Sequence, residues 1–204
     1  MTQFEIKDGV AIIPEGMTEI PFRAFFNCED LTTVVIPDSV TCIVNAAFYG
    51  CSSLTEIVIP NSVTSIGPGA FAYCSSLKNI VIPNSVTQIG YNAFGFCTSL
   101  TNIVIPNSVT SIGDRAFCCA PGRRLVIRNI RKLVTENETT TVKNASSLTS
   151  VTLPESLTEL GEDVFLGCEK LETIYVPTTK ANFYREHLPE TLHDKIVEFE
   201  PEQK

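Results

Sequence analysis

The chain contains 204 residues, of which 44% are hydrophobic and 19% charged, and its formal net charge at pH 7 is -8. This composition is rich enough in apolar residues for a buried core, and it excludes a disordered chain. The acidic balance argues against nucleic acid as a partner, because duplex binding requires an excess of cationic side chains. No run of about 20 apolar residues predicts a membrane-spanning helix.

Residues 1–13 predict an N-terminal cap in the form of a hairpin. Phe4 and Ile6 alternate with polar residues. Asp8-Gly9 is a common hairpin turn, and Val10 opens a returning strand. The first 20 residues lack a basic start followed by a long apolar run. Two locations therefore stay open: the cytoplasm for the chain as written, or the cell surface or exterior if a leader has been removed.

A 23-residue period runs through most of the chain and is marked by prolines. One series keeps this interval without a break: Pro14, Pro37, Pro60, Pro83 and Pro106. Pro154 and Pro177 are again 23 residues apart, but Pro106 and Pro154 are separated by 48. A fixed period of this length predicts a solenoid of about seven coils, in which each coil depends on its neighbours for a core.

Each repeat predicts two extended segments on opposite sides of its coil. In the coil that begins at Pro60, Ile80 and Ile82 end an LxxIxI pattern and have the period of a strand. Val63 and Ile66 predict the second extended segment. The same positions are apolar in the neighbouring repeats, so we expect two rows of short strands along the solenoid.

Glycine and phenylalanine mark the turn that follows the second segment. Gly67 and its counterparts predict a turn with positive φ. Ala70-Phe71, repeated in the neighbouring coils, predicts a short helical or 3₁₀ turn that directs the ring inward. One phenylalanine per coil then forms an aromatic column, and burying each ring contributes roughly 1.5–3 kcal/mol.

Cysteines recur in phase with the same repeat. Cys28, Cys51, Cys74 and Cys97 are 23 residues apart, and Cys168 holds the same position in its own coil. A fixed phase indicates a core position, where a thiol packs as a small apolar side chain. We therefore expect buried, reduced thiols, although coils about 4.8 Å apart would also allow disulfides. The sequence contains no CxxC pair, so it predicts no zinc site.

These residues resemble the BspA-like leucine-rich repeat proteins, whose 23-residue unit runs LxxIxIPxxVtxIgxxAFxxCxx. The similarity covers about residues 14–177, and the segment from Ile174 to Glu198 resembles the closing segment of such proteins. It implies a right-handed, curved leucine-rich repeat solenoid of the α/β type, capped at both ends. Such a fold has short parallel β-strands on a concave face, joined by 3₁₀ or short helical turns. The resemblance also implies protein-binding or adhesive roles, often at microbial cell surfaces, and brings no catalytic residues.

The whole chain, 1–204, is predicted to form a single domain with an interruption. Its predicted segments are the cap 1–13, regular repeats 14–117, an irregular segment 118–147, regular repeats 148–177, and a C-terminal cap and tail 178–204. In the irregular segment, Cys118-Cys119 displaces the expected cysteine, and a degenerate repeat follows from about Arg131. We expect that repeat to be thinner, more mobile and partly looped out.

The candidate partner-binding residues face outward on the predicted concave sheet, because side chains alternate along a strand. They are Val35, Val58, Val81, Val104, Glu56, Asn79, Asn102, Thr152 and Tyr175. The valine column lies beside prolines that lack an N–H donor. We therefore expect apolar or extended-peptide contact rather than recognition of sugar hydroxyls. The alternative is that β-branched residues stand here for strand propensity alone.

A basic cluster falls in the irregular segment. Six of the 15 Lys and Arg residues lie within 18 positions, among them the candidate binding residues Arg123, Arg124 and Arg128. One interpretation is that the cluster docks an acidic partner, and the other is that it is a solvated insertion. Docking would give an association rate that falls with salt.

No arrangement of residues in the sequence predicts catalysis, a cofactor or a metal site. His187 and His193 are six residues apart, which would place them on different faces of a helix, and there is no GxSxG or phosphate-binding loop. The predicted function is a monomeric, non-enzymatic interaction module, without membrane insertion, whose concave sheet binds a protein or peptide. The alternative is a microbial surface adhesin that binds a host matrix protein or a glycan.

Overall fold

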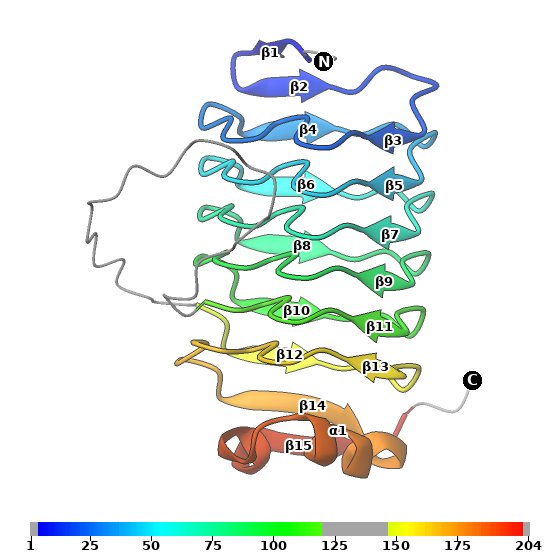
Figure 1. Cartoon of the computed structure of the whole chain (residues 1–204), viewed down its shortest axis with the longest axis vertical. Helices are drawn as coiled ribbons and strands as arrows, with labels where there is room; N and C mark the ends of the chain where they lie inside the picture. The colour runs from blue at the N-terminus through cyan, green and yellow to red at the C-terminus, as the bar shows by residue number, and fades with distance from the viewer. Residues whose placement is uncertain (1–3, 120–146, 202–204) are drawn as a thin grey trace.

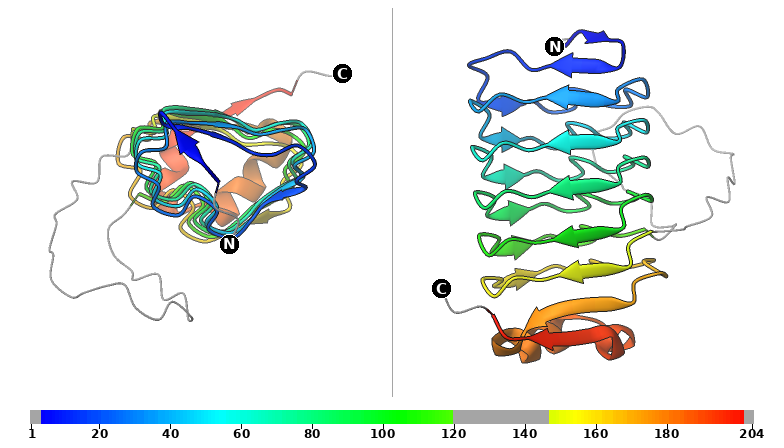
Figure 2. Two further views of the ribbon diagram at one scale, coloured as in Figure 1. Left: turned by 90° about the horizontal axis from the view of Figure 1, so that it is seen from above. Right: turned by 180° about the vertical axis from the view of Figure 1, so that it is seen from behind.

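The computed structural model describes residues 4–119 and 147–201. Within them the chain winds into stacked coils that superimpose closely when viewed along the axis (Figure 1, Figure 2). One row of strands, the first sheet, consists of β2 (Val10–Ile12), β4 (Thr33–Val35), β6 (Glu56–Val58), β8 (Asn79–Val81), β10 (Asn102–Val104), β12 (Ser150–Thr152), β14 (Thr173–Pro177) and β15 (Ile196–Phe199). The other row, the second sheet, consists of β3 (Glu19–Ile20), β5 (Cys42–Ile43), β7 (Ser65–Ile66), β9 (Gln88–Ile89), β11 (Ser111–Ile112) and β13 (Glu159–Leu160). The predicted solenoid of short parallel strands is confirmed.

Neighbouring coils pair in a constant register. In the second sheet, Ile43 pairs with Ile66, which in turn pairs with Ile89. In the first sheet, Ile57 pairs with Ile80. All five side chains are buried, because the inward positions of both sheets face the interior of the coil. One phase of the repeat therefore becomes one column of the core.

A column of stacked phenylalanine rings runs through the centre of the solenoid. Its members, in order, are Phe4, Phe25, Phe48, Phe71, Phe94, Phe117 and Phe165, and successive ring centroids lie 5.0 to 5.9 Å apart. The predicted aromatic column is confirmed. Phe4 adds a ring from outside the repeats, so the N-terminal hairpin extends the core as well as covering it.

The segment that carries each buried phenylalanine is a series of turns, not the helical or 3₁₀ turn that the sequence predicts. Its N–H groups alternate between two kinds of acceptor. The N–H of Ala70 donates to Gly67 within the coil, whereas the N–H of Phe71 donates to the carbonyl of Ala93 in the next coil. The turns also use left-handed backbone, as at Asn92 (φ 51°). A helix would keep its N–H groups within one coil and lose these links between coils.

The glycines before these turns allow the coils to approach closely. The positive φ predicted for them is absent at Gly67, Gly90, Gly113 and Gly161. A Cβ at Gly90 would lie 2.5 Å from the backbone nitrogen of Pro68, and one at Gly113 would lie 2.6 Å from that of Tyr91. Any side chain would therefore collide with the backbone of the neighbouring coil. That packing, rather than a left-handed turn, explains the glycine at this position.

A column of thiols packs beside the phenylalanines. Cys51, Cys74 and Cys97 are free and buried. Each Sγ donates a hydrogen bond to a phenylalanine carbonyl of the preceding coil, over 3.0 to 3.2 Å. Burial raises the pKa of all three thiols, because the thiolate would lose its hydration. The predicted burial of these thiols is confirmed, and all three are free cysteines in the structure.

The two ends of the solenoid are covered differently. At the N-terminus, β1 (Ile6–Lys7) pairs antiparallel with β2 as a hairpin. At the C-terminus lie η1 (Thr178–Lys180), α1 (Ala181–His187) and η2 (Glu190–Lys195). The hydroxyl of Tyr184 donates to the carbonyl of Pro154 over 2.5 Å, and Nζ of Lys180 donates to that of Leu157 over 3.1 Å. Side chains of this cap thus replace the hydrogen bonds that a further coil would provide.

The coils on either side of residues 120–146 are in direct contact. β10 pairs with β12, β11 pairs with β13, and the ring of Phe117 stacks on that of Phe165. The described coils on the two sides thus keep the register of the repeat, with an offset of 48 residues in place of 23. The predicted degenerate repeat falls on residues outside the described ranges.

Candidate protein-binding surface

The first sheet carries an exposed column of apolar side chains. Its central strands alternate exposed, buried, exposed, because one side chain in two points away from the core. The exposed fractions are 51% for Val35, 71% for Val58, 78% for Val81 and 64% for Val104. The structure therefore brings the four predicted valines together on one face. Because these side chains form a continuous exposed apolar column, this face is the candidate contact surface.

The column continues beyond the predicted residues at both ends. Ile12 is 67% exposed and pairs with Val35, and Val197 is 45% exposed and pairs with Tyr175. Ile12 lies 23 residues before Val35, so the period could have identified it. Val197 lies after the last proline of the series and carries no such signal. Thr152, predicted as a member, is half-buried and thus less exposed than the valines, and its hydroxyl interrupts the apolar column.

A polar row runs beside the apolar column, at the start of the same strands. Glu56, Asn79 and Asn102 are all exposed there, as predicted. Asn102 is held in place: its Oδ1 accepts hydrogen bonds from Ser150 Oγ at 2.8 Å and from Thr149 Oγ1 at 3.3 Å. The sheet therefore offers amide and carboxylate groups next to an apolar strip.

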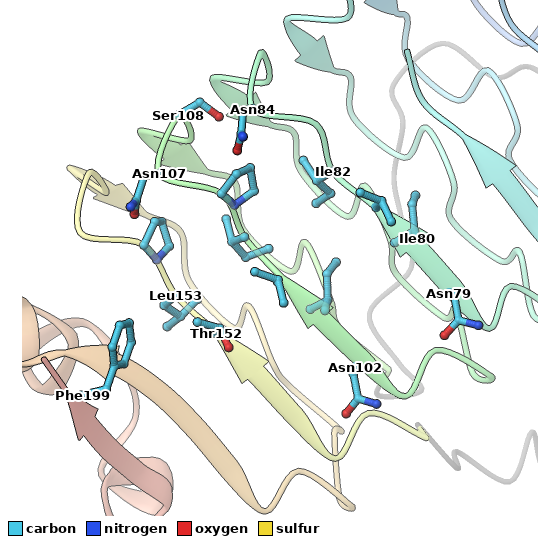
Figure 3. Close-up of a pocket in the computed structure, with 16 residues that line it drawn as sticks. Asn79, Ile80, Ile82, Asn84, Asn102, Asn107, Ser108, Thr152, Leu153 and Phe199 are labelled. Carbon is cyan, nitrogen blue, oxygen red and sulfur yellow. The ribbon is translucent and has the colours of Figure 1, made fainter. Parts of the chain in front are cut away.

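A shallow groove of about 840 Å³ crosses β8, β10 and β12 (Figure 3). Val81, Val104 and Thr152 line it, and Phe199 of β15 stands at its C-terminal end. Its other lining residues are Asn79, Ile80, Ile82, Asn84, Asn102, Ile103, Ile105, Pro106, Asn107, Ser108, Leu153 and Pro154. Asparagine amides stand on two sides of the groove, so this face presents hydrogen-bonding groups beside the apolar column. The sequence did not identify Asn84, Asn107 or Phe199.

The described lining of the groove holds no Asp, Glu, Lys, Arg or His, although the chain has a net charge of -8. The candidate residues Arg123, Arg124 and Arg128 lie outside the described ranges. Within residues 4–119 and 147–201, no group of three His, Cys, Asp or Glu side chains could hold a metal ion. The helices described in the same ranges are too short or too polar to cross a membrane.

Coils that keep one register, stacked around a phenylalanine column with one parallel strand of the first sheet in each, define a leucine-rich repeat protein. The sequence profile described as "BspA type Leucine rich repeat region" matches residues 9–122 and 80–188, in six copies. The chain belongs to this family, as its repeat predicts.

Solved structures of bacterial proteins share the fold. A leucine-rich repeat protein from Bacteroides ovatus ATCC 8483 is 30% identical with a TM-score of 0.67, over 94% of this chain and 45% of that protein. The T. pallidum Leucine Rich Repeat protein is 30% identical with a TM-score of 0.66, over 90% of this chain and 79% of that one. A leucine rich cell surface protein from Faecalibacterium prausnitzii A2-165 is 27% identical with a TM-score of 0.55, over 84% of this chain and 48% of that protein. The chain thus spans less than half of the first and third, and no curated protein matches it.

Proposed function

We propose that the protein is a non-enzymatic interaction module that binds a partner protein or peptide on its first sheet. The observation that carries this proposal is the apolar column from Ile12 to Val104, in which every member is more than half exposed. Burying such side chains against a partner contributes about 25 cal/mol per Å² of apolar surface. Because the column follows the solenoid axis, the partner would contact several coils at once.

A pair of matched variants tests the proposal. Val81→Glu places a charge in the centre of the column, whereas Gln88→Glu places the same charge on the second sheet, at another exposed strand position. The partner is first identified by photo-crosslinking, with a photoreactive residue in place of Val58 in the apolar column. Val81→Glu should then weaken its binding by at least about tenfold, while Gln88→Glu should leave it within about twofold. Both variants should keep the unfolding midpoint of the parent, and equal affinities would refute the proposal.

Arg123, Arg124 and Arg128 remain candidates for steering an acidic segment of the partner. Charges at the rim of an interface change the association rate more than the lifetime of the complex. Arg123→Glu/Arg124→Glu should therefore slow association and flatten its dependence on salt. An unchanged association rate would remove the cluster from the proposal.

An adhesin that recognises a host matrix protein or a glycan is the second candidate. It is favoured by the similarity to the cell surface protein of F. prausnitzii, of which this chain spans 48%. Binding of the full chain to immobilised matrix proteins and to a glycan array would test it. Saturable binding that Val81→Glu abolishes would support an adhesin that uses the same face.

A further inference from the structure

Asparagine amides stand on two sides of the groove across β8, β10 and β12. Asn79 and Asn102 lie at the start of their strands, and Asn84 and Asn107 lie beyond the ends of the same strands (Figure 3). The amide groups of Asn79 and Asn84 have no hydrogen-bond partner among the described residues. An amide offers two N–H donors and a carbonyl acceptor, the same groups that a peptide backbone presents.

Asn102 is already oriented by its neighbours. The hydroxyls of Thr149 and Ser150 donate to its Oδ1, which therefore points toward β12. Its Nδ2 makes one long contact, 3.4 Å to Thr101 Oγ1, so the second N–H remains available to a ligand. Orientation in advance lowers the entropy that binding would otherwise cost.

The absence of ionisable side chains from the described lining restricts the chemistry of a ligand. A charged group placed on Val81 and Val104 would lose hydration and find no opposite charge in the groove. The net charge of -8 is carried elsewhere on the chain. An uncharged segment, with apolar side chains for the valines and polar groups for the amides, complements this surface.

The amides also distinguish an extended segment from a helix. In a helix the backbone N–H and C=O groups are bonded to each other, so a helical ligand could reach the rim amides with its side chains but not with its backbone. An extended segment presents these groups along its whole length. Three neighbouring coils span about 10 Å, which equals the rise of about three extended residues. A short segment along the axis therefore passes both Asn79 and Asn102.

We propose that the groove binds an uncharged, extended peptide segment lying along the solenoid axis. The segment pairs its backbone with the amides of Asn79 and Asn102 and rests its apolar side chains on Val81 and Val104. This inference rests on the proposed function and names the kind of partner that the first sheet takes.

The test screens the full chain against two phage-displayed libraries and a neutral oligosaccharide array. One library displays linear decapeptides, and the other displays a three-helix scaffold with one randomised helical face. Every binder is then measured against Val81→Glu, Asn79→Leu and the matched control Asn61→Leu. Asn61 is exposed like Asn84 but lies one coil outside the groove. Asn79 is preferred to Asn102 for substitution because its amide supports no other side chain.

The expected binders are uncharged linear peptides that Val81→Glu abolishes. Asn79→Leu should weaken them by about fivefold to tenfold, the effect of one lost hydrogen bond, and Asn61→Leu by less than about twofold. N-methylation of the peptide nitrogens should reproduce the loss at the positions that pair with the amides. Binders found only in the helical library would overturn the extended-peptide inference, while the proposed function survives if Val81→Glu abolishes them. Binders found only among oligosaccharides would overturn both and support the adhesin alternative. If Val81→Glu affects no binder from any source, both fail.

Discussion

The Sγ of Cys74 donates a hydrogen bond to the carbonyl oxygen of Phe48, 3.2 Å away in the preceding coil. Cys51 makes the same bond to Phe25, and Cys97 to Phe71. The cysteine column therefore links the coils that the phenylalanine column stacks. Two features that appear independent in the repeat pattern form one hydrogen-bonded core.

These thiols should react slowly in the native protein. A disulfide reagent at neutral pH should modify the half-buried Cys28 and Cys42 first, and Cys51, Cys74 and Cys97 only after denaturant is added. Thiol titration followed by peptide mass analysis distinguishes the sites. Rapid native labelling of Cys74, or loss of two protons per pair in the intact mass, would contradict the buried, reduced column.

Stability should decline in alkaline solution. The pKa of Cys51 rises from 9.0 to about 12, first because burial disfavours the thiolate. Since the folded-state value exceeds the unfolded one, the contribution is complete below about pH 8 and is lost as pH rises from about 9 toward 12. Each such thiol should lower the free energy of unfolding by about 1.4 kcal/mol per pH unit in that window. Urea unfolding at several pH values measures how steeply the free energy of unfolding falls. Cys51→Ala should remove the share of one thiol, about 1.4 kcal/mol per pH unit, from that slope.

Removing a central ring should cost more than removing a terminal one. Phe71 is fully buried between Phe48 and Phe94, so Phe71→Ala should lower the free energy of unfolding by roughly 3–5 kcal/mol. Phe165 is the last ring of the column in the described coils and stacks on Phe117, so Phe165→Ala should increase hydrogen exchange only in the last coils. Equal, global losses for the two variants would show that the solenoid unfolds as one unit.

Adding a side chain should separate the two kinds of glycine. Gly90→Ala should destabilise the protein by about 1–3 kcal/mol or more, because the new Cβ meets the backbone of the neighbouring coil. Gly69 has a φ of +62° and no atom closer than 3.9 Å to an added Cβ. Gly69→Asn should therefore stay within about 0.5 kcal/mol of the parent, because asparagine tolerates left-handed backbone. Thermal unfolding of the pair provides the comparison, and similar losses would refute the close-approach explanation.

The C-terminal cap should depend on one hydroxyl. Tyr184→Phe removes the hydrogen bond to the Pro154 carbonyl and leaves the ring in place. The expected cost is about 1–3 kcal/mol, because the buried carbonyl loses its partner. Amide exchange should accelerate in β13 and β14 while the N-terminal coils keep the protection of the parent. A uniform change along the chain would mean that the cap acts on the whole solenoid.

The period of the sequence predicts most of the fold because each column holds one type of residue at one phase. Phe71, Cys74 and Val81 could be placed inside or outside the coil on that basis alone. The turns could not: Gly67 is required by the backbone of a neighbouring coil, which no single repeat contains. Val197 and Phe199 were missed as parts of the surface for a related reason. They come from the cap, where the period ends and only the folded chain brings them beside β14.

The junction between Cys119 and Ser147 also has a consequence for protein engineering. Twenty-five residues beyond the normal period are accommodated there while Ser150 still pairs with Asn102 and Glu159 with Ser111. The same corner of the coil recurs in the regular repeats, for example between Tyr73 and Ser76. A loop or small domain grafted at such a corner would leave both strand ladders intact. The described coils thus keep their register across a longer connection at this corner, and the equivalent corners are the positions at which to test a graft.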